Sequence, residues 1–465
     1  MYTATIGLEI HVELKTRSKM FCGCKNDPHD AEPNTLICPI CMAHPGTLPV
    51  PNKQAIESVV TFGQAVGGTI ATYSEFDRKN YFYPDIPKAY QLSQYAFPFV
   101  RGGMVAGVLL TRVHLEEDTA RSQHDKGDGS LVDYNRAGVP LMELVTEPVI
   151  HDAKTAGDFA RELQLLLRTL KISDANMERG EMRVEANISV SKDETLGTKV
   201  EVKNLNSFRS VEAAINYEID RHIQVLEAGG VISQETRGWD EQKLETFSQR
   251  SKETAKDYRY FPDPDIPKLD MRSIEAFRAE KIAEKIGLLP QEKREKYSYL
   301  GLPNNQIEDI ITNQHIDAYF AEVLQIAGTE ADLVKVAANY ILTDFSKVDY
   351  LSPTLLAPSE FVSLMRLVVS KQITSRVAKD LLAEFANNST DMAKVIADRG
   401  LSSNFSEADL MRIVDSVIAD AQTVVAEYRA GKTASIQYLL GQAMKQTKGA
   451  ADPTTLKALF ESRLQ

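Results

Sequence analysis

The amino-acid sequence predicts an α+β fold, in which a mainly antiparallel-sheet cradle domain precedes an all-α helical domain and a small helical tail domain. Three observations predict this fold. Segments of the first 300 residues alternate polar and apolar side chains, as strands with one buried face do. The same 300 residues hold 19 of the 25 glycines and 15 of the 19 prolines. Beyond them, apolar residues recur at spacings of three and four, as on amphipathic helices.

The expected strands share a polar, chargeable face. In Ile6–Leu14 the apolar side chains occupy the even positions, while Glu9, His11 and Glu13 occupy the odd ones. The same alternation recurs in three further segments, Thr111–Glu116, Arg183–Ser191 and Lys199–Lys203. We therefore expect helices such as Ala153–Leu170 to cover the apolar side of a sheet whose other side forms a polar cradle.

Two changes in the sequence predict domain boundaries. The turn-rich part ends near Leu288–Pro290, and Ala318–Ile326 and Asp332–Leu342 then have helical periodicity. A weaker boundary is the loop-like stretch Asp398–Asn404, because Ser406–Asp409 after it has the spacing of a helix N-cap. A chain of 465 residues is also too long for one ordinary core. We expect domains at residues 1–290, 291–397 and 398–465.

Composition excludes several classes of protein. An apolar fraction of 43% and a charged fraction of 25% are typical of globular proteins. The sequence has no apolar run long enough to span a membrane and no N-terminal signal pattern, which predicts a cytoplasmic protein without membrane segments. A net charge of −12 argues against indiscriminate binding of nucleic acid, although a local basic patch stays compatible with it.

The four cysteines form one cluster, Cys22-x-Cys24-x₁₃-Cys38-x₂-Cys41. Two close pairs separated by a short loop supply four thiolates to one tetrahedral Zn²⁺. Four cysteine ligands leave no open position, so the expected zinc is structural, in a zinc-binding loop at residues 22–41. The alternative is a set of buried or redox-active thiols, and a zinc knuckle that binds nucleic acid is also open.

The pattern Glu9-x-His11-x-Glu13 is a candidate Mg²⁺ site. Alternate residues of a strand lie on one face about 7 Å apart, and Mg²⁺ prefers a few carboxylates together with waters and phosphates. Acidic residues on other expected strands are candidate helpers, namely Glu116, Glu117, Asp118, Glu143, Glu147 and Glu185. The alternative is an ordinary solvated strand face.

Cations interleaved with aromatic residues suit contacts with phosphates and bases. This pattern occurs in Asp77–Asp85, followed by Lys88, Tyr90 and Gln91, and again in Asp257–Pro262. Exposed loops anchored by their aromatic rings would look the same. Polar donors at a strand end occur in Lys203–Phe208, and the segment Arg429–Lys457 carries five cations against one acidic residue. This basic segment is either a solvated helix face or a surface for phosphates.

The absence of several common catalytic and nucleotide-binding motifs excludes some classes of reaction. Gly431-Lys432-Thr433 lacks the preceding glycine of a Walker A motif, and no complete G-x-G-x-x-G, G-x-S-x-G or H-E-x-x-H occurs. The cysteines are assigned to metal, so a Cys/His nucleophile is not expected. We therefore do not expect this chain to hydrolyse glutamine by itself.

Ordered strings over nearly the whole chain resemble the family of B subunits of aspartyl/glutamyl-tRNA amidotransferases. They are Gly7–Leu14, Asp77–Asp85, His114–Asp118, Asn135–Leu141, Lys203–Phe208, Asp257–Pro264 and the tail around Leu439–Gly449. The resemblance implies a cradle domain that uses ATP and Mg²⁺, and helical and tail domains that hold tRNA. It implies that the chain phosphorylates the side-chain carboxylate of Glu-tRNA(Gln) or Asp-tRNA(Asn), which ammonia then amidates. It also implies a heterotrimer, in which the amidase (the A subunit) supplies ammonia from glutamine and the small C subunit completes the complex.

The resemblance also implies roles for individual residues. Glu9, His11, Glu117 and Glu143 would surround Mg²⁺. Arg183, Glu185 and Asn187 would lie beside them, toward ATP and the ammonia path. Cofactor-binding roles fall to Lys79, Tyr81, Tyr83, Lys88, Lys203 and Asn204. Zinc is a variable feature of the family, which agrees with a structural role for it here.

Two other functions stay open at this point. One is a zinc-stabilised adaptor that binds tRNA without catalysis, and such a protein would bind tRNA equally well without Glu9 or His11. The other is a self-contained ATP-dependent ligase that takes free ammonia, which would be fully active without partners. ATP hydrolysis that requires misacylated tRNA separates the expected enzyme from both.

Overall fold

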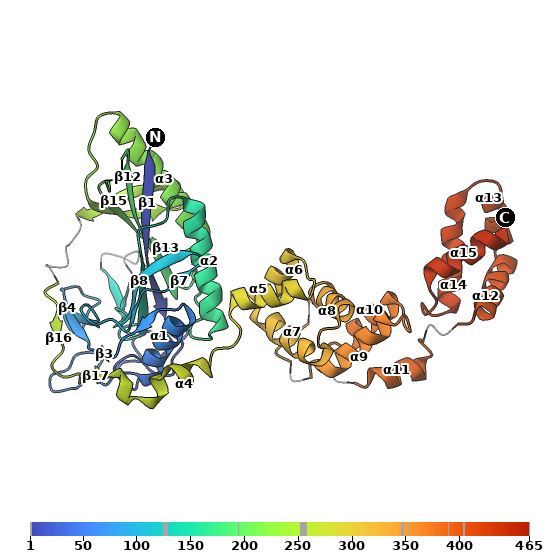
Figure 1. Ribbon diagram of the computed structural model, residues 1–465, viewed down its shortest axis with the longest axis horizontal. Helices are drawn as coiled ribbons and strands as arrows, with labels where there is room; N and C mark the ends of the chain where they lie inside the picture. The colour runs from blue at the N-terminus through green and yellow to red at the C-terminus, as the bar shows by residue number, and fades with distance from the viewer. Residues whose placement is uncertain are drawn as a thin grey trace. The chain divides into compact units, whose positions relative to one another are not determined.

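The structure is a computed structural model, and it describes residues 2–123, 129–193, 195–251, 258–345, 348–352, 354–388, 390–402 and 405–464. The chain divides into two compact units, Met1–Pro290 and Gln291–Gln465 (Figure 1). The first unit is built on a large sheet and the second is helical, so the predicted α+β class is confirmed.

A sheet of ten strands forms the centre of the first unit, as far as the described residues define it. Its order is β15-β14-β13-β12-β1-β11-β8-β6-β2, and β7 pairs with β8. The strands are β1 (Thr3–Glu13), β2 (Thr69–Ile70), β6 (Val100–Arg101), β7 (Met104–Val105), β8 (Val108–Glu117), β11 (Pro140–Thr146), β12 (Met182–Ser191), β13 (Val200–Leu205), β14 (Glu235–Asp240) and β15 (Glu245–Ser251). Neighbours are antiparallel except β13 and β14, as predicted for a mainly antiparallel sheet.

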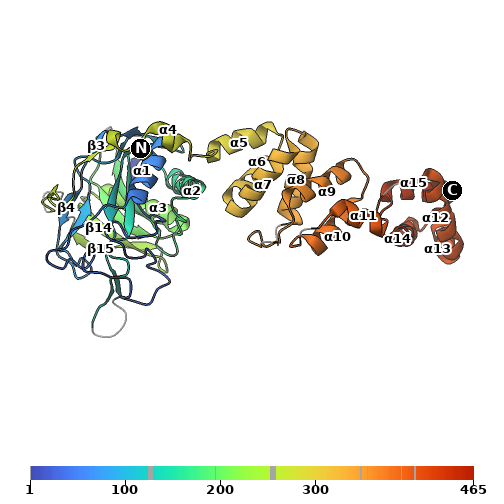
Figure 2. The ribbon, with the colours of Figure 1, turned by 90° about the horizontal axis from the view of Figure 1, so that it is seen from below.

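Helices α1 (Lys53–Ala65), α2 (Ala153–Thr169) and α3 (Phe208–Glu227) cover one face of this sheet (Figure 2). The even side chains of β1, such as Ile6 and Ile10, are fully buried in the core under these helices. Gly63 lets α1 approach closely, because a Cβ atom there would lie 2.5 Å from Val100 Cγ2. The opposite face of the sheet carries the odd residues of β1 and therefore presents the predicted polar surface.

Side-chain caps explain where these helices begin. Asn52 accepts hydrogen bonds from the backbone N–H groups of Gln54 and Ala55 at the start of α1. Asp152 and Ser207 cap α2 and α3 in the same way. Each cap satisfies backbone donors that have no partner within the helix.

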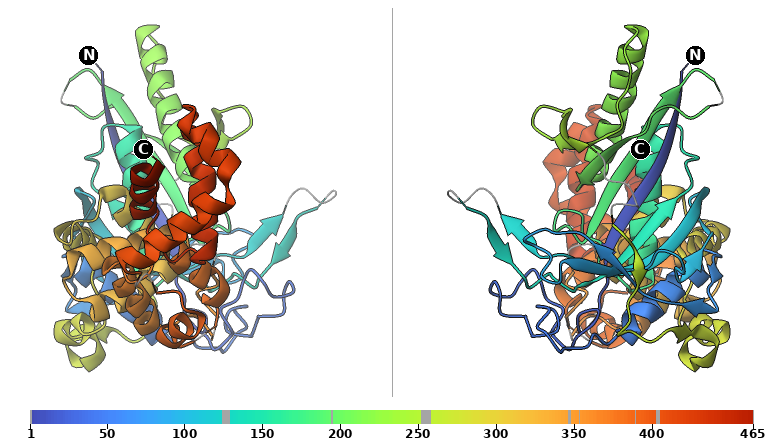
Figure 3. Two further views of the ribbon diagram at one scale, coloured as in Figure 1. Left: turned by 90° about the vertical axis from the view of Figure 1, so that its right-hand side faces the viewer. Right: turned by 90° about the vertical axis from the view of Figure 1, so that its left-hand side faces the viewer.

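Short strands bring distant segments of the first unit together. They are β3 (Tyr73–Ser74) with β17 (Leu269–Asp270), β5 (Tyr90–Ser93) with β4 (Asp77–Asn80) and β16 (Phe261–Pro262), and β9 (Arg121–Gln123) with β10 (Leu131–Asp133). The pairing of β4 with β16 places the second cation–aromatic segment beside the first, although its first residue, Asp257, lies outside the described residues. The teal strands β9 and β10 stand away from the rest of the unit in Figure 3. The unit ends with short helical segments at Met271–Ser273, Glu275–Phe277 and Ala279–Ala283 (α4).

The second unit consists of helices. They are α5 (Pro290–Tyr299), α6 (Asn304–Thr312), α7 (Gln314–Ala327), α8 (Ala331–Thr343), α9 (Pro358–Val369), α10 (Ser375–Phe385), α11 (Met392–Arg399), α12 (Glu407–Asp420), α13 (Gln422–Arg429), a short turn at Thr433–Ser435, α14 (Ile436–Gln446) and α15 (Pro453–Leu464). The helices predicted from periodicity, Ala318–Ile326 and Asp332–Leu342, lie within α7 and α8. Of the described helices, none is long and apolar enough to cross a membrane.

Helices α12–α15 share a core of their own, which includes Val414, Leu439 and Phe460. Ser406 and Asp409 form a capping box at the start of α12, as the sequence predicts. The expected loop begins later than predicted, because α11 continues to Arg399, and its residues Ser403 and Asn404 lie outside the described part of the chain. A division of the second unit into two domains stays a prediction, which the separate core supports.

Candidate active site

The sheet register brings charged residues of four strands to one place on the polar face. His11 in β1 lies opposite Glu143 in β11 and opposite Arg183 in β12. Glu143 in turn lies opposite His114 in β8. Because side chains of directly paired residues point to the same face of a sheet, these groups converge.

Carboxylates surround the two histidines at short distances. His11 Nε2 lies 3.4 Å from Glu143 Oε2, 3.5 Å from Glu116 Oε1 and 3.9 Å from Glu9 Oε1. His114 Nε2 lies 3.4 Å from Glu143 Oε2. Glu143 is therefore the common partner of both histidines, and only 7% of its side chain is exposed.

Burial and mutual charge shift the pKa values of these groups. Burial and the charges of Glu143 and Glu185 raise the pKa of Glu9 to about 7. Burial opposes protonation of His11, but the hydrogen bond to Glu143 and the charges of Glu143 and Glu116 raise its pKa to about 9. Burial also opposes ionisation of Glu143, but the charge of His114 and the hydrogen bond from His11 hold its pKa well below the usual range. A positive charge bound between Glu9 and Glu143 would therefore be strongly favoured.

The residues fit a divalent cation. Ligand atoms of Glu9, His11 and Glu143 lie within 4.8 Å of one another, as do those of His114, Glu116 and Glu143. Among the described residues, the buried atoms His11 Nδ1, His114 Nδ1 and Glu116 Oε2 have no hydrogen-bond partner. Buried polar atoms are rarely left without a partner, so their state here agrees with a site that binds a ligand.

A second acidic group lies next to the first. Ligand atoms of Glu9, Glu185 and Glu201 also lie within 4.8 Å of one another. Lys203 Nζ lies 2.8 Å from Glu185 and 3.9 Å from Glu201. Burial opposes protonation, but the charges of these two carboxylates raise the pKa of Lys203 above its usual range.

Two further residues of the predicted site lie on the same strands. Asn187 lies opposite Gly7 and Glu201 in the sheet. Asn204 is exposed at the far end of β13, apart from the second acidic group.

Residues of both acidic groups line a polar cavity of about 340 Å³. Its lining residues are Glu9, Lys79, Gln94, Tyr95, Arg112, His114, Glu143, Lys199, Glu201, Lys203, Thr236, Tyr258 and Tyr260. Burial works against the charge of Lys79, but Glu116 and other neighbours raise its pKa well above the usual value. The cavity therefore combines carboxylates for a metal ion with cations for phosphates.

Tyrosine rings form a continuous row beside Lys79. Ring centroids are 6.1 Å apart for Tyr83 and Tyr81, 5.7 Å for Tyr81 and Tyr258, and 6.1 Å for Tyr258 and Tyr260. The Lys79 ammonium lies 5.1 Å from the centroid of Tyr258 and 5.9 Å from that of Tyr81. The two cation–aromatic segments thus form one wall, as the pairing of β4 with β16 requires.

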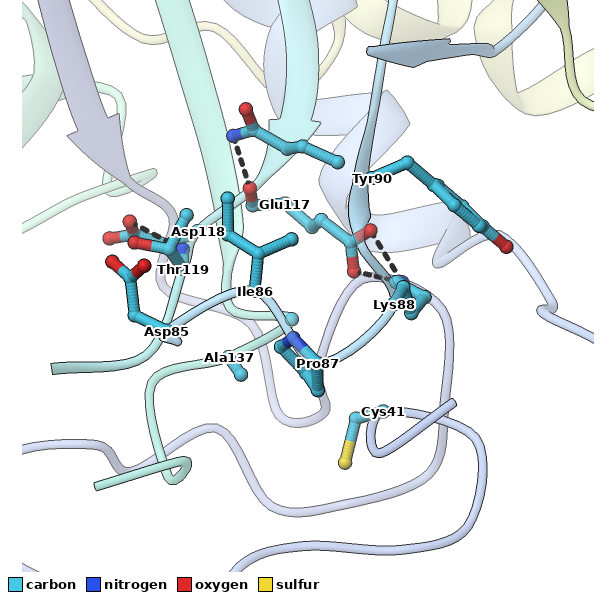
Figure 4. Close-up of a pocket in the computed structure, with 12 residues that line it drawn as sticks. Cys41, Asp85, Ile86, Pro87, Lys88, Tyr90, Glu117, Asp118, Thr119 and Ala137 are labelled. Carbon is cyan, nitrogen blue, oxygen red and sulfur yellow. Dashed lines mark hydrogen bonds and ion pairs between the residues drawn. The ribbon is translucent and has the colours of Figure 1, made fainter. Parts of the chain in front are cut away.

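Glu117 differs from the expectation that placed it with Glu9, His11 and Glu143. Its carboxylate forms an ion pair with Lys88 and accepts a hydrogen bond of 2.9 Å from Leu92 N, in a small separate pocket shown in Figure 4. Glu116 occupies the place beside His11 instead, because alternate residues of β8 face the cluster. Lys88, the partner of Glu117, is likewise not among the residues that line the cavity beside Glu9 and Glu143.

Arg183, on the same face, forms its ion pair with Asp118. Its Nη2 atom lies 2.8 Å from Asp118 Oδ2, and Arg136 Nε lies 3.6 Å from the same oxygen. Burial opposes ionisation of Asp118, but the two arginines lower its pKa. Arg183 therefore anchors the polar face to the segment after β8. The candidate helper Glu147 accepts a hydrogen bond from Thr111 and is likewise not part of the cluster.

The four cysteines are free thiols whose Sγ atoms lie within 4.8 Å of one another. The Sγ atoms of Cys38 and Cys41 are 3.8 Å apart. Two sulfurs of a tetrahedral zinc site with bonds of about 2.3 Å are separated by about 3.8 Å, so the arrangement fits zinc. A hydrogen bond from Cys22, with smaller contributions from the Cys38 backbone and Lys19, lowers the pKa of Cys41 to about 5, which favours the thiolate that metals bind.

Sequence reasoning left several residues that line the cavity without an individual role, namely Arg112, His114, Glu201, Tyr258 and Tyr260. The signal for most of them is the two-residue period of the strands. Arg112, His114 and Glu116 alternate with buried apolar residues in the sequence, and this alternation alone identifies Glu116 rather than Glu117 as the neighbour of His114.

Comparisons with known proteins identify the family of this chain. A family model described as the GatB/GatE catalytic domain matches residues 4–275, and one described as the GatB domain matches residues 318–464. A relative from Thermoanaerobacter sp. (strain X514), named as the B subunit of aspartyl/glutamyl-tRNA(Asn/Gln) amidotransferase, is 40% identical over 479 aligned residues, covering 100% of this chain and 99% of its own. Proteins of the same name from Dehalococcoides mccartyi (40% identity, 100% and 99% covered) and Rippkaea orientalis (39%, 100% and 98%) are similarly close. The chain belongs to the family of B subunits of aspartyl/glutamyl-tRNA(Asn/Gln) amidotransferases.

Proposed function

We propose that this chain carries out the ATP-dependent step of aminoacyl-tRNA amidation. It phosphorylates the side-chain carboxylate of Glu-tRNA(Gln) or Asp-tRNA(Asn), and ammonia then displaces the phosphate to give Gln-tRNA(Gln) or Asn-tRNA(Asn). Membership of the amidotransferase family supports the reaction class. The observation that supports the site best is the convergence of Glu9, His11 and Glu143 beside a cavity that also contains Lys79 and Lys203.

In this proposal Glu9, His11 and Glu143 hold Mg²⁺, and Glu116 takes the place expected for Glu117. When bound, Mg²⁺ would neutralise phosphate oxygens during transfer of the phosphoryl group. Phosphoryl transfer depends mainly on positioning and on neutralisation of charge. Lys79 supplies a positive charge inside the cavity.

Other residues of the cavity would orient the two substrates. The tyrosine row, with Tyr81 and Tyr83 at one end, offers ring faces to a base or a ribose. Lys203 on β13 and Glu185 on β12 form an ion pair, and we assign this part of the site to the path of ammonia. The roles expected for Lys88 and Asn204 in nucleotide binding receive no support from their positions.

The zinc site is proposed as structural, since Cys22, Cys24, Cys38 and Cys41 fill all four positions of a tetrahedral ion. The source of ammonia lies outside this chain, because its sequence has no recognisable glutaminase motif. We therefore propose that it works with the amidase (A) and small (C) subunits of a heterotrimer, in the cytoplasm where aminoacyl-tRNA is used.

The second unit offers a surface for tRNA. The charged residues that line a cavity of about 1550 Å³ there are four cations, Lys371, Arg376, Lys445 and Lys448, and two carboxylates, Asp380 and Asp452. Lys445 and Lys448 are exposed, and among the described residues no carboxylate forms an ion pair with either of them. Two other cations of the basic segment have ion-pair partners, since Lys432 pairs with Glu427 and Lys457 lies 3.7 Å from Glu461. Cations on a concave surface suit the phosphate backbone of an RNA.

The test is co-expression with candidate A and C subunits, followed by assays of three activities of the complex. These are glutamine hydrolysis, ATP hydrolysis dependent on Glu-tRNA(Gln) or Asp-tRNA(Asn), and formation of the amidated tRNA. We expect His11→Ala and Glu143→Gln to abolish the second and third activities and to leave the first intact.

Glu147→Gln is the matched control, because Glu147 lies just beyond β11, the strand of Glu143, but outside the cluster. It should retain all three activities. Normal tRNA-dependent ATP hydrolysis by His11→Ala would contradict the assignment of the site. A stable complex that binds tRNA without any ATP hydrolysis would favour an adaptor, and full activity of the chain alone would favour a self-contained ligase.

A further inference from the structure

Lys19 has an unusual environment for a lysine. Its side chain is fully buried, next to the candidate zinc loop. The ammonium group donates to Ala137 O at 2.8 Å and to Tyr134 O at 3.2 Å, and it lies 4.0 Å from Cys41 Sγ. Among the described residues, no carboxylate lies within ion-pair distance of it.

A buried ammonium group needs a counter-charge. Removing it from water costs several kcal/mol unless an opposite charge and hydrogen bonds compensate. Two carbonyl oxygens satisfy two of its three N–H donors but bring no net charge. Four thiolates around one Zn²⁺ carry a net charge of −2, so the cysteine cluster is the nearest available counter-charge for Lys19.

The carbonyl oxygens that Lys19 holds belong to the segment Tyr134–Gly138, which also contacts the zinc loop directly. Asn135 is fully buried, accepts a hydrogen bond of 2.8 Å from Leu36 N and donates one of 2.7 Å to Glu32 O. Gly138 lies between the two parts: a Cβ atom there would lie 3.6 Å from Cys41 Cβ, 3.6 Å from Lys19 Cδ and 3.8 Å from Glu117 Oε2.

The same segment contacts the polar face of the sheet. Arg136 donates to Thr119 O and lies 3.6 Å from Asp118 Oδ2, and Asp118 binds Arg183, which lies opposite His11 in the register. Figure 4 shows Cys41 and Ala137 on one side of the small pocket in which Lys88 pairs with Glu117. A continuous chain of contacts therefore runs from the cysteines to the residues that flank the active site.

We propose that Lys19 is a positioning residue that links the charge of the zinc centre to the segment Tyr134–Gly138. Through this link, the segment holds Asp118 and Arg183 against the polar face of the sheet. Zinc then organises the edge of the active site, beyond holding its own loop together. This inference rests on the zinc centre of the proposed function. Outer partners of a metal site commonly change metal affinity or activity by about 10- to 100-fold.

The first experiment compares wild type, Lys19→Met and Lys15→Met as full-length protein in the assembled complex. Zinc content is measured by atomic emission, and zinc affinity by competition with a chromogenic chelator. Lys15 is the matched control, since it is exposed and pairs with Asp174 at the surface. We expect Lys19→Met to bind zinc at least about 10-fold more weakly and Lys15→Met to match wild type.

The second experiment measures hydrogen exchange of backbone amides. In wild type, removal of zinc should speed exchange in residues 131–138 and leave helix α2 unchanged. Lys19→Met should speed exchange in the same residues while zinc is bound. The double variant Lys19→Met/Cys24→Ser should add little to Cys24→Ser alone, because both changes act through one centre.

The results of these experiments distinguish the existence of the zinc centre from the role of Lys19. A wild-type protein that binds no zinc would overturn the zinc centre itself, and the role of Lys19 with it. Zinc binding with equal affinity in wild type and Lys19→Met would overturn only the role of Lys19. If Lys19→Met does not fold, unchanged exchange of residues 131–138 after removal of zinc from wild type would overturn the coupling, and faster exchange would support it.

Discussion

A buried carboxylate at the far edge of the sheet provides a quantitative test of how the first unit is held together. Glu218 on α3 is completely buried and contacts Arg221 at 2.7 Å, His222 at 3.2 Å and Arg237 at 3.2 Å. It also accepts a hydrogen bond from Thr246 on β15. The network therefore connects the helix with the strands β14 and β15.

Glu218→Gln should destabilise the first unit by about 3 kcal/mol at pH 7. Burial opposes ionisation, but hydrogen bonds from His222, Arg221 and Thr246 lower the pKa of Glu218 from 4.5 to about 2. Each pKa unit corresponds to about 1.4 kcal/mol, which gives this estimate. Loss of one member of a buried ion pair costs a similar amount in other proteins, about 3–5 kcal/mol.

Urea unfolding monitored by tryptophan fluorescence measures this effect, because the only tryptophan, Trp239, lies on β14 two residues beyond Arg237. With a slope of about 3 kcal/mol per molar urea, the midpoint should fall by about 1 M. Glu227→Gln is the control, since Glu227 is exposed at the end of the same helix.

The pH dependence has a definite sign. The pKa of Glu218 is lower in the folded state, so its contribution is fully present above about pH 4.5 and is lost as the pH falls toward 2. The difference in stability between wild type and Glu218→Gln should therefore be largest at pH 7 and shrink below pH 4.5. Equal midpoints of the two proteins at pH 7 would refute the reasoning.

Two further predictions concern the proposed active site and the proposed tRNA surface. Glu116→Gln should lower tRNA-dependent ATP hydrolysis by about 100-fold or more, and Glu117→Gln should lower it less. The reason is that, of these two residues, only Glu116 lies beside His11. The reverse order in a steady-state assay would contradict the site as described. Lys445→Gln and Lys448→Gln should each weaken tRNA binding and reduce by about 1 the slope of log affinity against log salt in filter-binding assays, while an unchanged slope would exclude a phosphate contact.

The polar face of the sheet was predictable because its signal is local. A strand repeats every two residues, so the odd residues of β1 share one face whatever the rest of the chain does. The same rule groups His114 with Glu116 on β8. The four predicted strands and the predicted helix of the first unit, and the capping box of α12, likewise follow from patterns within a few residues.

The partners of individual charges were not predictable in this way. Glu117 is the last residue of β8, where alternation ends and the chain turns, and its partner Lys88 is 29 residues away. Arg183 shares the face of His11, but Asp118 binds it, because a buried guanidinium requires a carboxylate. Such pairs depend on strand register and loop paths, which sequence periodicity does not specify.

The ion pairs of the active site bear on metal binding and stability. Among the described residues, Glu9 and Glu116 have only His11 as an ion-pair partner, and Glu116 Oε2 has no hydrogen-bond partner. A divalent cation between these carboxylates would supply the missing charge and would bind the folded state alone. Binding at 100 times the dissociation constant stabilises a protein by about 2.7 kcal/mol.

We therefore expect Mg²⁺ at millimolar concentration to raise the unfolding temperature of the first unit, measured by tryptophan fluorescence. The increase should be much smaller in Glu143→Gln than in Glu147→Gln. Equal effects of Mg²⁺ on the two variants would mean that the ion acts elsewhere, because Glu147 binds Thr111 outside the cluster whereas Glu143 contacts both histidines.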